Sequence, residues 1–198
     1  MRRHSIVLLG VLAAFVGSAP AGRVLAAPPQ KDSHEFRETY TGTLVGIGGG
    51  AGGRTANFTL RLNASVSPDV VQRYAELLRS KGQDALLDQL RDKDVGTFSV
   101  TGQTGRTVNF AFIQNTGEGR RVIVIFERWL QLFEIRNGTR SENYPFTYLE
   151  FSIDEKGKGN GTFIGAAKVY FDKDDPNTLN VENFATYPLR VVNVTAKR

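Results

Sequence analysis

Five carboxylates in or beside the sheet-forming segments are the best candidates for catalysis in this sequence. Glycoside hydrolysis uses two carboxyl groups about 5–9 Å apart across a groove, one as the acid and the other as the nucleophile or base. The spacing selects no such pair, and alternation places Glu150 on the polar, exposed side of its strand. A carboxylate-dependent hydrolase is therefore the alternative hypothesis, and its candidate residues are Glu127, Glu134, Glu150, Asp154 and Glu155.

Oxygen ligands crowd into the segment from Asp172 to Asn177, which also contains Asp174 and Asp175. Calcium prefers such clusters, but the spacing fails for an EF-hand loop. Pro176 takes the fifth position of that loop, and Asn177 takes the sixth, where a glycine is required. We interpret the segment as an acidic turn and assign no metal ligand.

Gly48, Gly50 and Gly53 match the GxGxxG pattern of dinucleotide sites. In those sites the loop joins a strand to a helix whose N-terminus holds the pyrophosphate. Here the segment that follows, Thr55 to Leu62, alternates as a strand does. The sequence therefore predicts a glycine-rich hairpin loop and no nucleotide cofactor.

Composition removes most nucleophilic and imidazole chemistry. The chain has no Cys, and its two histidines are His4 and His34. Both fall in the expected leader and tail, so Ser-His-Asp catalysis, Cys-His catalysis and the usual zinc ligand sets are excluded. We assign no catalytic or cofactor-binding residue and expect a non-catalytic protein.

Residues 1–26 have the three-part order of a cleavable signal peptide. Arg2 and Arg3 give a basic start, residues 5–16 are apolar, and Val24-Leu25-Ala26 ends in small residues. The apolar stretch is shorter than the ~20 residues that span a bilayer. We expect an extracytoplasmic protein, periplasmic or secreted, whose mature chain does not span the membrane.

Removal of this leader makes the protein less basic. The formal charge of +5 falls by three, because Arg2, Arg3 and Arg23 leave and no acidic residue does. A nucleic-acid partner, which needs a concentrated basic stripe, is not expected. We interpret the remaining arginine cluster as solvated charge on strand edges, which discourages aggregation: Arg120, Arg121, Arg128, Arg136 and Arg140.

The elements that must position these residues are mostly strands. From Glu38 onward apolar and polar residues alternate, and Thr55 to Leu62 is the clearest case. Further strands are predicted for a face of Val108, Phe110 and Phe112, for Arg121–Phe126 buried on both sides, for Leu149, Phe151 and Ile153, for a single face of Phe163, Gly165, Ala167, Val169 and Phe171, and for Leu189–Val194. Turns are predicted at 117–119, 137–138, 156–159 and 174–177.

Residues 67–92 have helical periodicity instead. Ser67-Pro68-Asp69 supplies an N-cap, a proline in the first turn and an acid beside it. An apolar stripe follows, and Lys81-Gly82 ends the first helix before a second begins at Asp84. We predict an inserted αα-hairpin that is either a lid over a cavity or, as we favour, a cover for exposed core. Its apolar residues are Val70, Val71, Tyr74, Leu77, Leu78, Leu86, Leu87 and Leu90.

Several short segments of the C-terminal half stand out as a set: Tyr144-Pro145-Phe146, Asp154–Gly159, Gly161-Thr162, Ala166-Ala167-Lys168 and Pro188–Val194. On these segments the chain resembles a family of uncharacterised bacterial exported β-rich proteins. The hairpin residues Lys81-Gly82 and Leu86-Leu87 also fit. The resemblance implies export and a β-rich fold, but no activity and no site residue.

These observations predict one mainly β domain over residues 38–198, after a leader over 1–26 and a flexible tail over 27–37. Its architecture is an antiparallel barrel or sandwich of about 8–10 strands with the helical hairpin inserted. The leading functional hypothesis is non-catalytic binding of a small apolar ligand or an envelope protein. A structural or adhesive envelope protein is a further alternative, which would show a large exposed apolar patch.

Overall fold

The computed structural model describes residues 4–5, 33–47, 52–128, 143–172, 178–184 and 187–197. The predicted turns at 137–138 and 174–177 lie outside these ranges, as do Glu134, Arg136, Arg140 and all of the predicted leader except residues 4–5.

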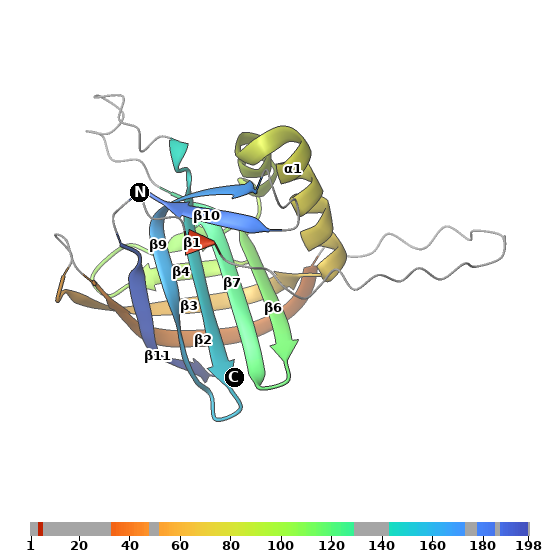
Figure 1. Cartoon of the computed structure of the whole chain (residues 1–198). Coiled ribbons are helices and arrows are strands. Elements are labelled where there is room, and N and C mark those ends of the chain that lie inside the picture. The colour runs from red at the N-terminus through yellow and green to blue at the C-terminus, as the bar shows by residue number, and fades with distance from the viewer. Residues whose placement is uncertain are drawn as a thin grey trace, which may run out of the picture.

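The described residues form strands and a helical hairpin, which confirms a mainly β fold with a helical insertion. The strands are β1 (His4–Ser5), β2 (Ser33–Val45), β3 (Thr55–Val66), β4 (Gly96–Val100), β5 (Arg106–Val108), β6 (Phe110–Thr116), β7 (Gly119–Glu127), β8 (Phe146–Asp154), β9 (Lys158–Phe171), β10 (Leu179–Asn183) and β11 (Leu189–Lys197), and the hairpin is α1 (Pro68–Leu90). One antiparallel sheet has the order β5-β4-β3-β2-β11-β9-β8-β7-β6, with β10 pairing with β9 and β1 with β10 (Figure 1).

The two ends of this order meet because β5 and β6 are consecutive in the chain. Only Asn109 separates Val108, at the end of β5, from Phe110, at the start of β6. β6 also lies against β3, and β5 against β7, so the sheet curls on itself. Figure 1 shows β2, β3 and β4 crossing behind β7, β8 and β9. The curled sheet therefore has an inner face between these two layers and an outer face.

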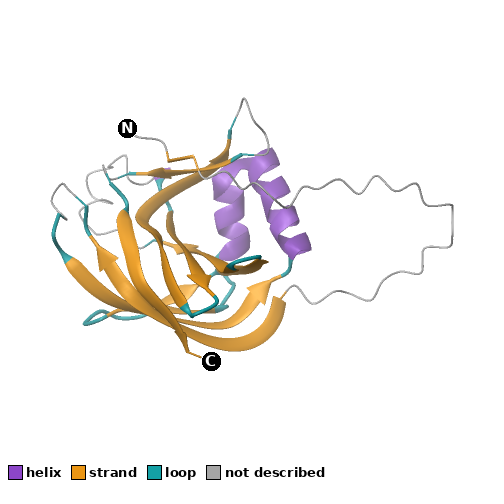
Figure 2. Cartoon of the chain, turned by 60° about the horizontal axis from the view of Figure 1, so that its bottom comes forward, coloured by secondary structure: helices purple, strands orange, loops and turns teal. Residues whose placement is uncertain are grey.

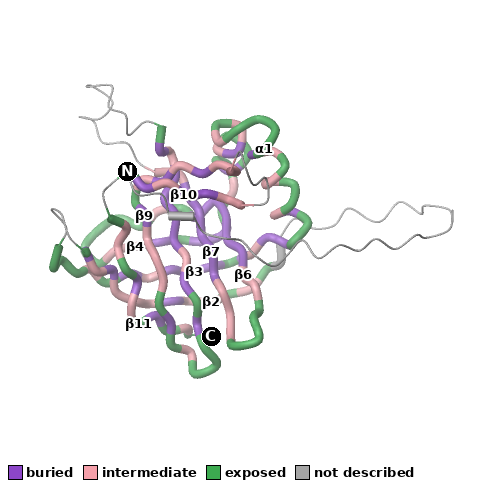
Figure 3. The backbone as a smooth tube through the Cα atoms, in the orientation of Figure 1, coloured by how far each residue is buried: buried purple, intermediate pink, exposed green. Residues whose placement is uncertain are grey.

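Buried apolar side chains form two clusters, one on each face of the sheet. Figure 3 colours the backbone by burial and shows buried stretches along the strands, with exposed residues in the turns and on α1. The inner cluster contains Tyr40, Leu44, Phe58, Leu60, Leu62, Ala64, Val95, Phe98, Val108, Ala111, Val122, Val124, Phe126, Leu149, Phe151, Ile153, Val191 and Val194. The outer cluster, which α1 covers, contains Val66, Val70, Leu78, Leu86, Leu90, Phe110, Phe112, Ile123, Ile125, Phe146, Tyr148, Ile164, Ala167, Val169 and Val181.

Alternation predicted the faces of β3, β7 and β8. In β3 the residues Phe58, Leu60 and Leu62 all join the inner cluster, and in β8 Leu149 does the same. The run Val122–Phe126 is buried throughout, because its side chains alternate between the inner and outer clusters. The prediction that this strand is buried on both sides is confirmed.

The single face predicted for Val108, Phe110 and Phe112 is wrong. Val108 packs in the inner cluster, whereas Phe110 and Phe112 pack in the outer one. Asn109 lies between β5 and β6 and is not a paired residue in either the β4–β5 or the β6–β7 ladder. An unpaired residue reverses the faces of the residues that follow it, because side chains alternate with period two.

The single face predicted for the long strand β9 is also wrong. Phe146 pairs with Ala167, but Tyr148 pairs with Ile164, so one extra residue of β9 is left over between the two pairs. This bulge turns Phe163 toward the inner cluster, while Ala167 and Val169 pack in the outer one.

β2 begins at Ser33, within the stretch that the sequence predicted to be a flexible tail. Residues 33–35 pair with 64–66 of β3, and the register shifts between Glu35 and Glu38. The sheet-forming part of the chain thus starts before the expected boundary at Glu38.

The arginines at the start of β7 are not solvated edge charges, which corrects the prediction for two of them. Arg120 forms an ion pair with Glu38 at 2.7 Å, and Arg121 forms one with Glu150 at 2.5 Å. The side chains in both pairs are largely buried, at 13–21% exposure. Tyr40 donates a hydrogen bond to Glu38. Since Tyr40 and Glu38 belong to β2 and Arg120 belongs to β7, the three side chains join these strands across the curled sheet.

α1 is two helical limbs joined at Gly82, as the sequence predicted. Gly82 has φ 81° and ψ −178°, a conformation that almost only glycine adopts. Pro68 begins the first limb, but the Ser67 hydroxyl donates to Asp69 at 3.3 Å instead of capping a backbone N–H. Figure 2 shows the two limbs side by side against one side of the sheet.

Candidate functional site

A small apolar cavity lies between α1 and the outer face of the sheet. Its volume is about 90 Å³, which is less than the ~150 Å³ of an engineered apolar cavity that stays dry and binds benzene. Every side chain that lines it is apolar except for the hydroxyl of Tyr74. The lining residues are Val71, Tyr74, Ala75, Leu78, Leu86, Leu90, Phe110, Ile125, Val169, Phe171 and Leu179.

Helical spacing brings both limbs of α1 to the cavity. Val71, Ala75 and Leu78 follow one another at intervals of four and three residues, so they lie on one face of the first limb. The reversal at Gly82 returns the chain, and the second limb contributes Leu86 and Leu90 at the same spacing. The cavity's roof is therefore formed by Ala75 and by five residues of the predicted apolar stripe: Val71, Tyr74, Leu78, Leu86 and Leu90.

The sheet supplies the floor from β6, β7, β9 and β10. Phe110 of β6 pairs with Ile125 of β7, and Phe171 of β9 pairs with Leu179 of β10. The reversal of faces at Asn109 and the bulge in β9 direct Phe110 and Phe171 toward α1. Neither feature was predicted from alternation, so the residues of the cavity's floor were not predicted.

Two ring contacts connect α1 to this floor. The ring of Tyr74 lies 6.1 Å from that of Phe110, at an interplanar angle of 56°. The guanidinium carbon of Arg79 lies 4.1 Å above the ring centroid of Phe171. Since Arg79 is exposed and Phe171 lines the cavity, the cation stands at the cavity's edge.

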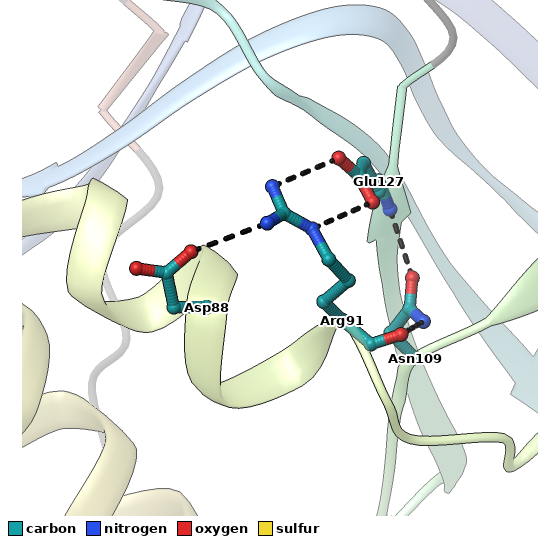
Figure 4. Close-up of polar contacts among 4 residues, drawn as sticks. All are labelled: Asp88, Arg91, Asn109 and Glu127. Carbon is teal, nitrogen blue, oxygen red and sulfur yellow. Dashed lines mark hydrogen bonds and ion pairs between the residues drawn. The ribbon is translucent and has the colours of Figure 1, made fainter.

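The second limb of α1 is fastened to the sheet through Asn109 (Figure 4). The Asn109 amide nitrogen donates to the carbonyls of Lys93 at 2.9 Å and Arg91 at 3.3 Å, and its oxygen accepts from the Glu127 N–H at 2.9 Å. The Arg91 guanidinium reaches Glu127 at 3.3 Å and Asp88 at 3.4 Å. The hydrogen bonds that Arg91 donates to Glu127 raise the pKa of Arg91, but these exposed pairs add little stability.

The bend between the limbs has one further attachment. Gln83, directly after Gly82, donates from Nε2 to the carbonyl of Asn143 at 3.0 Å. The second limb is thus held at the bend and at its C-terminal end, and apolar side chains of both limbs surround the cavity.

The inner face of the sheet is filled with aromatic side chains. Phe98 is central: its ring lies 5.6 Å from that of Phe58, 5.4 Å from that of Phe126 and 5.5 Å from that of Phe163. Tyr40 and Phe151 make an edge-to-face contact at 5.2 Å. These rings pack against one another on the inner face, so we take the cavity under α1 as the candidate site.

The described candidate carboxylates do not converge on one groove. Glu127 pairs with Phe146 and Glu150 with Ile123, so four ladder positions separate the two acids along β7 and β8. Four positions also separate Glu150 from Asp154 along β8. At ~3.3 Å per residue each separation is about 13 Å, which exceeds the 5–9.5 Å of known glycosidase pairs.

Each of these acids has a structural partner instead. Glu150 accepts from Arg121 at 2.5 Å and from the Tyr148 hydroxyl at 2.5 Å, so its predicted exposure is wrong. Burial, followed by the charge of Glu150, raises the pKa of Tyr148. Asp154 accepts from the Lys158 N–H at 2.9 Å and thereby closes the β8–β9 turn. Glu155 is exposed in that turn.

The other motifs from the sequence take structural places where they are described. Gly53 lies in the loop that joins strand β2 to strand β3, and it donates to the Gly46 carbonyl at 3.3 Å; Gly48 and Gly50 lie outside the described residues. Asp172 accepts from the Asn180 amide at 2.8 Å. Across the described ranges no three His, Cys, Asp or Glu side chains gather as metal ligands, and no helix there is long and apolar enough to cross a bilayer.

Exposed large hydrophobic residues are few in the part of the chain that the structure describes. They are Ile47, Phe184 and Tyr187. Ile47 lies in the β2–β3 loop, whereas Phe184 and Tyr187 flank the connection between β10 and β11, where Phe184 packs edge-on against Tyr144. These residues do not supply the large patch expected of an adhesive protein.

Searches of family models, curated proteins and solved structures found no match to this chain. The functional argument therefore rests on the geometry of the cavity and its surroundings.

Proposed function

We propose that this protein binds a small apolar group, without catalysing a reaction, in the cavity between α1 and the outer face of the sheet. The observation that supports this most directly is the cavity itself, a space of about 90 Å³ lined by apolar side chains. Such a space holds no polar partners for water, so its occupation by an apolar group is favourable.

The hairpin has the properties of a lid over this site. Its second limb is attached to the rest of the chain through Asn109 and Gln83. Apolar side chains of both limbs line the cavity, and separate side chains of this kind can adjust to a guest. Gly82, with φ 81° and ψ −178°, forms the bend that joins the two helical limbs.

A hydrolase receives less support from the same geometry. Glu127, Glu150 and Asp154 are spaced along two adjacent strands, and each has a structural partner. None of them lines the apolar cavity.

We further infer that the ligand is met outside the cytoplasm, in the periplasm or after secretion. The support is the three-part leader over residues 1–26. Its removal would take away β1, which pairs with β10 through His4 and Ser5 alone. Mass measurement of the protein recovered from its own host should show a chain that begins after Ala26, and retention of the leader would contradict this.

Titration with 1-hexanol tests the binding proposal. Burial of about four carbons of the chain at ~0.8 kcal/mol each gives about 3 kcal/mol, so we expect a dissociation constant in the millimolar range. Ligand-observed NMR measures such weak affinities. The variant Ala75→Leu places a larger side chain in the cavity, and we expect it to weaken binding at least ~tenfold.

Gln72→Leu is the matched control, because Gln72 is on the same limb of α1 but is exposed and does not line the cavity. It adds an apolar side chain of the same kind and should leave the affinity unchanged. The proposal would be overturned if Ala75→Leu bound 1-hexanol as tightly as the wild-type protein does, or if the wild-type protein showed no saturable binding of 1-hexanol.

A further inference from the structure

We propose that the apolar group bound under α1 is an aliphatic side chain of an extended peptide, which adds to the open edge of β10 as a further antiparallel strand. It rests on the proposed function and on removal of the leader, and it adds the class of partner. Three features support it: the strand that holds this edge in the full chain, the place of Leu179 in the cavity wall, and a buried acceptor on Asn180.

Removal of the leader turns β10 into an edge strand. Among the described strands, β10 pairs with β9 on one side and with β1 on the other, and β1 consists of His4 and Ser5 (Figure 1). Cleavage after Ala26 would take β1 away and expose a row of backbone N–H and C=O groups, which is a template for another extended chain. β10 contains neither lysine nor proline, the residues that commonly block such an edge.

The β1–β10 ladder shows how an extended chain fits this edge. His4 lies opposite Val181 in an antiparallel register, and the next pair is Ser5 with Asn180. A peptide that keeps this register and continues by one residue places that residue opposite Leu179, which lines the cavity. Directly opposite side chains share a face of the sheet, with Cβ atoms ~4.5–5.5 Å apart. The added side chain therefore stands beside Leu179 at the wall of the cavity.

The size and lining of the cavity favour an aliphatic side chain. A space of about 90 Å³ is smaller than the ~150 Å³ that holds benzene, so a branched alkyl group fits it better than a ring does. An apolar lining offers a ligand few polar contacts. In strand addition the backbone hydrogen bonds supply affinity, and the pocket for a side chain supplies specificity.

Asn180 offers a polar contact on the other face of the added strand. Its side chain is buried, at 4% exposure, and its amide nitrogen donates to Asp172 at 2.8 Å. Its Oδ1 accepts no hydrogen bond within the part of the chain that the structure describes. Because successive side chains point to opposite faces, a residue opposite Asn180 shares this face, where a serine or threonine hydroxyl can donate to Oδ1. The preferred partner thus carries a hydroxyl residue directly before an aliphatic one.

A synthetic peptide of residues 2–7, acetylated and amidated at its ends, is the probe, because it carries Ser5 and Ile6 in this order. We expect saturable binding to the processed protein, measured by ligand-observed NMR, with slower hydrogen exchange of β10 amides. Alternate N–H groups of an antiparallel strand face its neighbour. N-methylation of one of these two peptide residues should therefore abolish binding, whereas methylation of the other should change it little.

Side-chain substitutions test the link to the cavity. In the peptide, Ile6→Asn should weaken binding about tenfold, because a polar side chain gains nothing from the apolar space. In the protein, Ala75→Leu should weaken binding of the unmodified peptide by about tenfold as well, but should leave the affinity for the Ile6→Asn peptide unchanged. Gln72→Leu, exposed on the same limb, is the matched control and should alter neither affinity.

Each failure has a distinct meaning. The inference is overturned if the peptide does not bind, if neither N-methylation weakens it, or if Ala75→Leu binds the unmodified peptide as the wild-type protein does; binding of 1-hexanol would remain intact in all three cases. A mass that shows the leader retained would also overturn it, because β1 would keep the edge. Failure of the peptide and 1-hexanol alike would instead overturn the proposed function.

Discussion

Replacement of Asn109 by alanine should destabilise the fold more than its small change in volume suggests. The Asn109 side chain is buried at 6% exposure and makes three hydrogen bonds, to the carbonyls of Arg91 and Lys93 and from the N–H of Glu127. At about 1 kcal/mol each, their loss costs about 3 kcal/mol. Alanine would leave the Glu127 N–H without a partner at the point where the sheet passes from β5 to β6.

Urea denaturation followed by circular dichroism measures this cost. With a dependence on urea of roughly 2 kcal/mol per molar, the unfolding midpoint should fall by about 1.5 M. Asn115→Ala is the control, because Asn115 is on the same strand β6 but is exposed, and its midpoint should change little. If the two variants unfold within about 0.3 M of each other, the reasoning that Asn109 joins the sheet to the hairpin is refuted.

Three further substitutions test other parts of the structure. Gly82→Ala should lower the free energy of unfolding by about 2 kcal/mol, because φ 81° with ψ −178° is strained for alanine. Gly117→Ala, in an open turn, is the control and should change the urea midpoint little. Equal midpoints for the two variants would contradict a bend at Gly82 between the two limbs. The cost of Tyr148→Phe to the free energy of unfolding should be about 1.4 kcal/mol smaller at pH 11 than at pH 9. Burial keeps the folded phenol protonated, whereas the unfolded phenol ionises near pH 10. Alkaline pH therefore favours unfolding of the wild-type protein through this group, and the variant lacks it. The exposed phenol of Tyr187 is its control, and a constant difference for Tyr148→Phe across this range would show that the phenol is not held protonated. Gly161→Ala should prevent accumulation of folded protein, because its Cβ would lie 1.9 Å from the Glu150 carbonyl oxygen; a soluble variant with an unchanged circular dichroism spectrum would contradict that close approach.

Features that depend on local sequence were predictable. The helical hairpin follows from Pro68, Gly82 and an apolar stripe, and each of these acts through the backbone of its own segment. The run Val122–Phe126 is apolar at every position, so burial on both faces requires no knowledge of the neighbouring strands.

Features that depend on pairing between strands were not predictable. Val108, Phe110 and Phe112 keep a perfect alternation in sequence, yet their faces reverse at Asn109 because the chain changes partner strands there. One feature of the sequence could have indicated the reversal: the polar residue Asn109 interrupts an apolar run, and the apolar Ala111 then occupies the position that alternation assigns to the polar face. The cavity depends on this reversal, and so its floor escaped prediction.

The buried ion pairs were missed for a related reason. Arg120 and Arg121 are adjacent in sequence, and we interpreted them as solvated charge on strand edges. In the structure each reaches an acid on a different strand, Glu38 or Glu150. Both acids stand two residues from a tyrosine on the same strand, and that repeated spacing is the signal that could have marked them as partly buried.

Methyl NMR of the purified protein during titration with 1-hexanol tests the central claim most directly, because it reports where the ligand binds. The account predicts saturable shifts for Leu78, Leu86 and Ile125, which line the cavity under α1, and no comparable shifts for Leu60 and Leu149 in the inner cluster. Shifts confined to the inner cluster, or none in either cluster at saturating 1-hexanol, would contradict a binding site between the hairpin and the sheet.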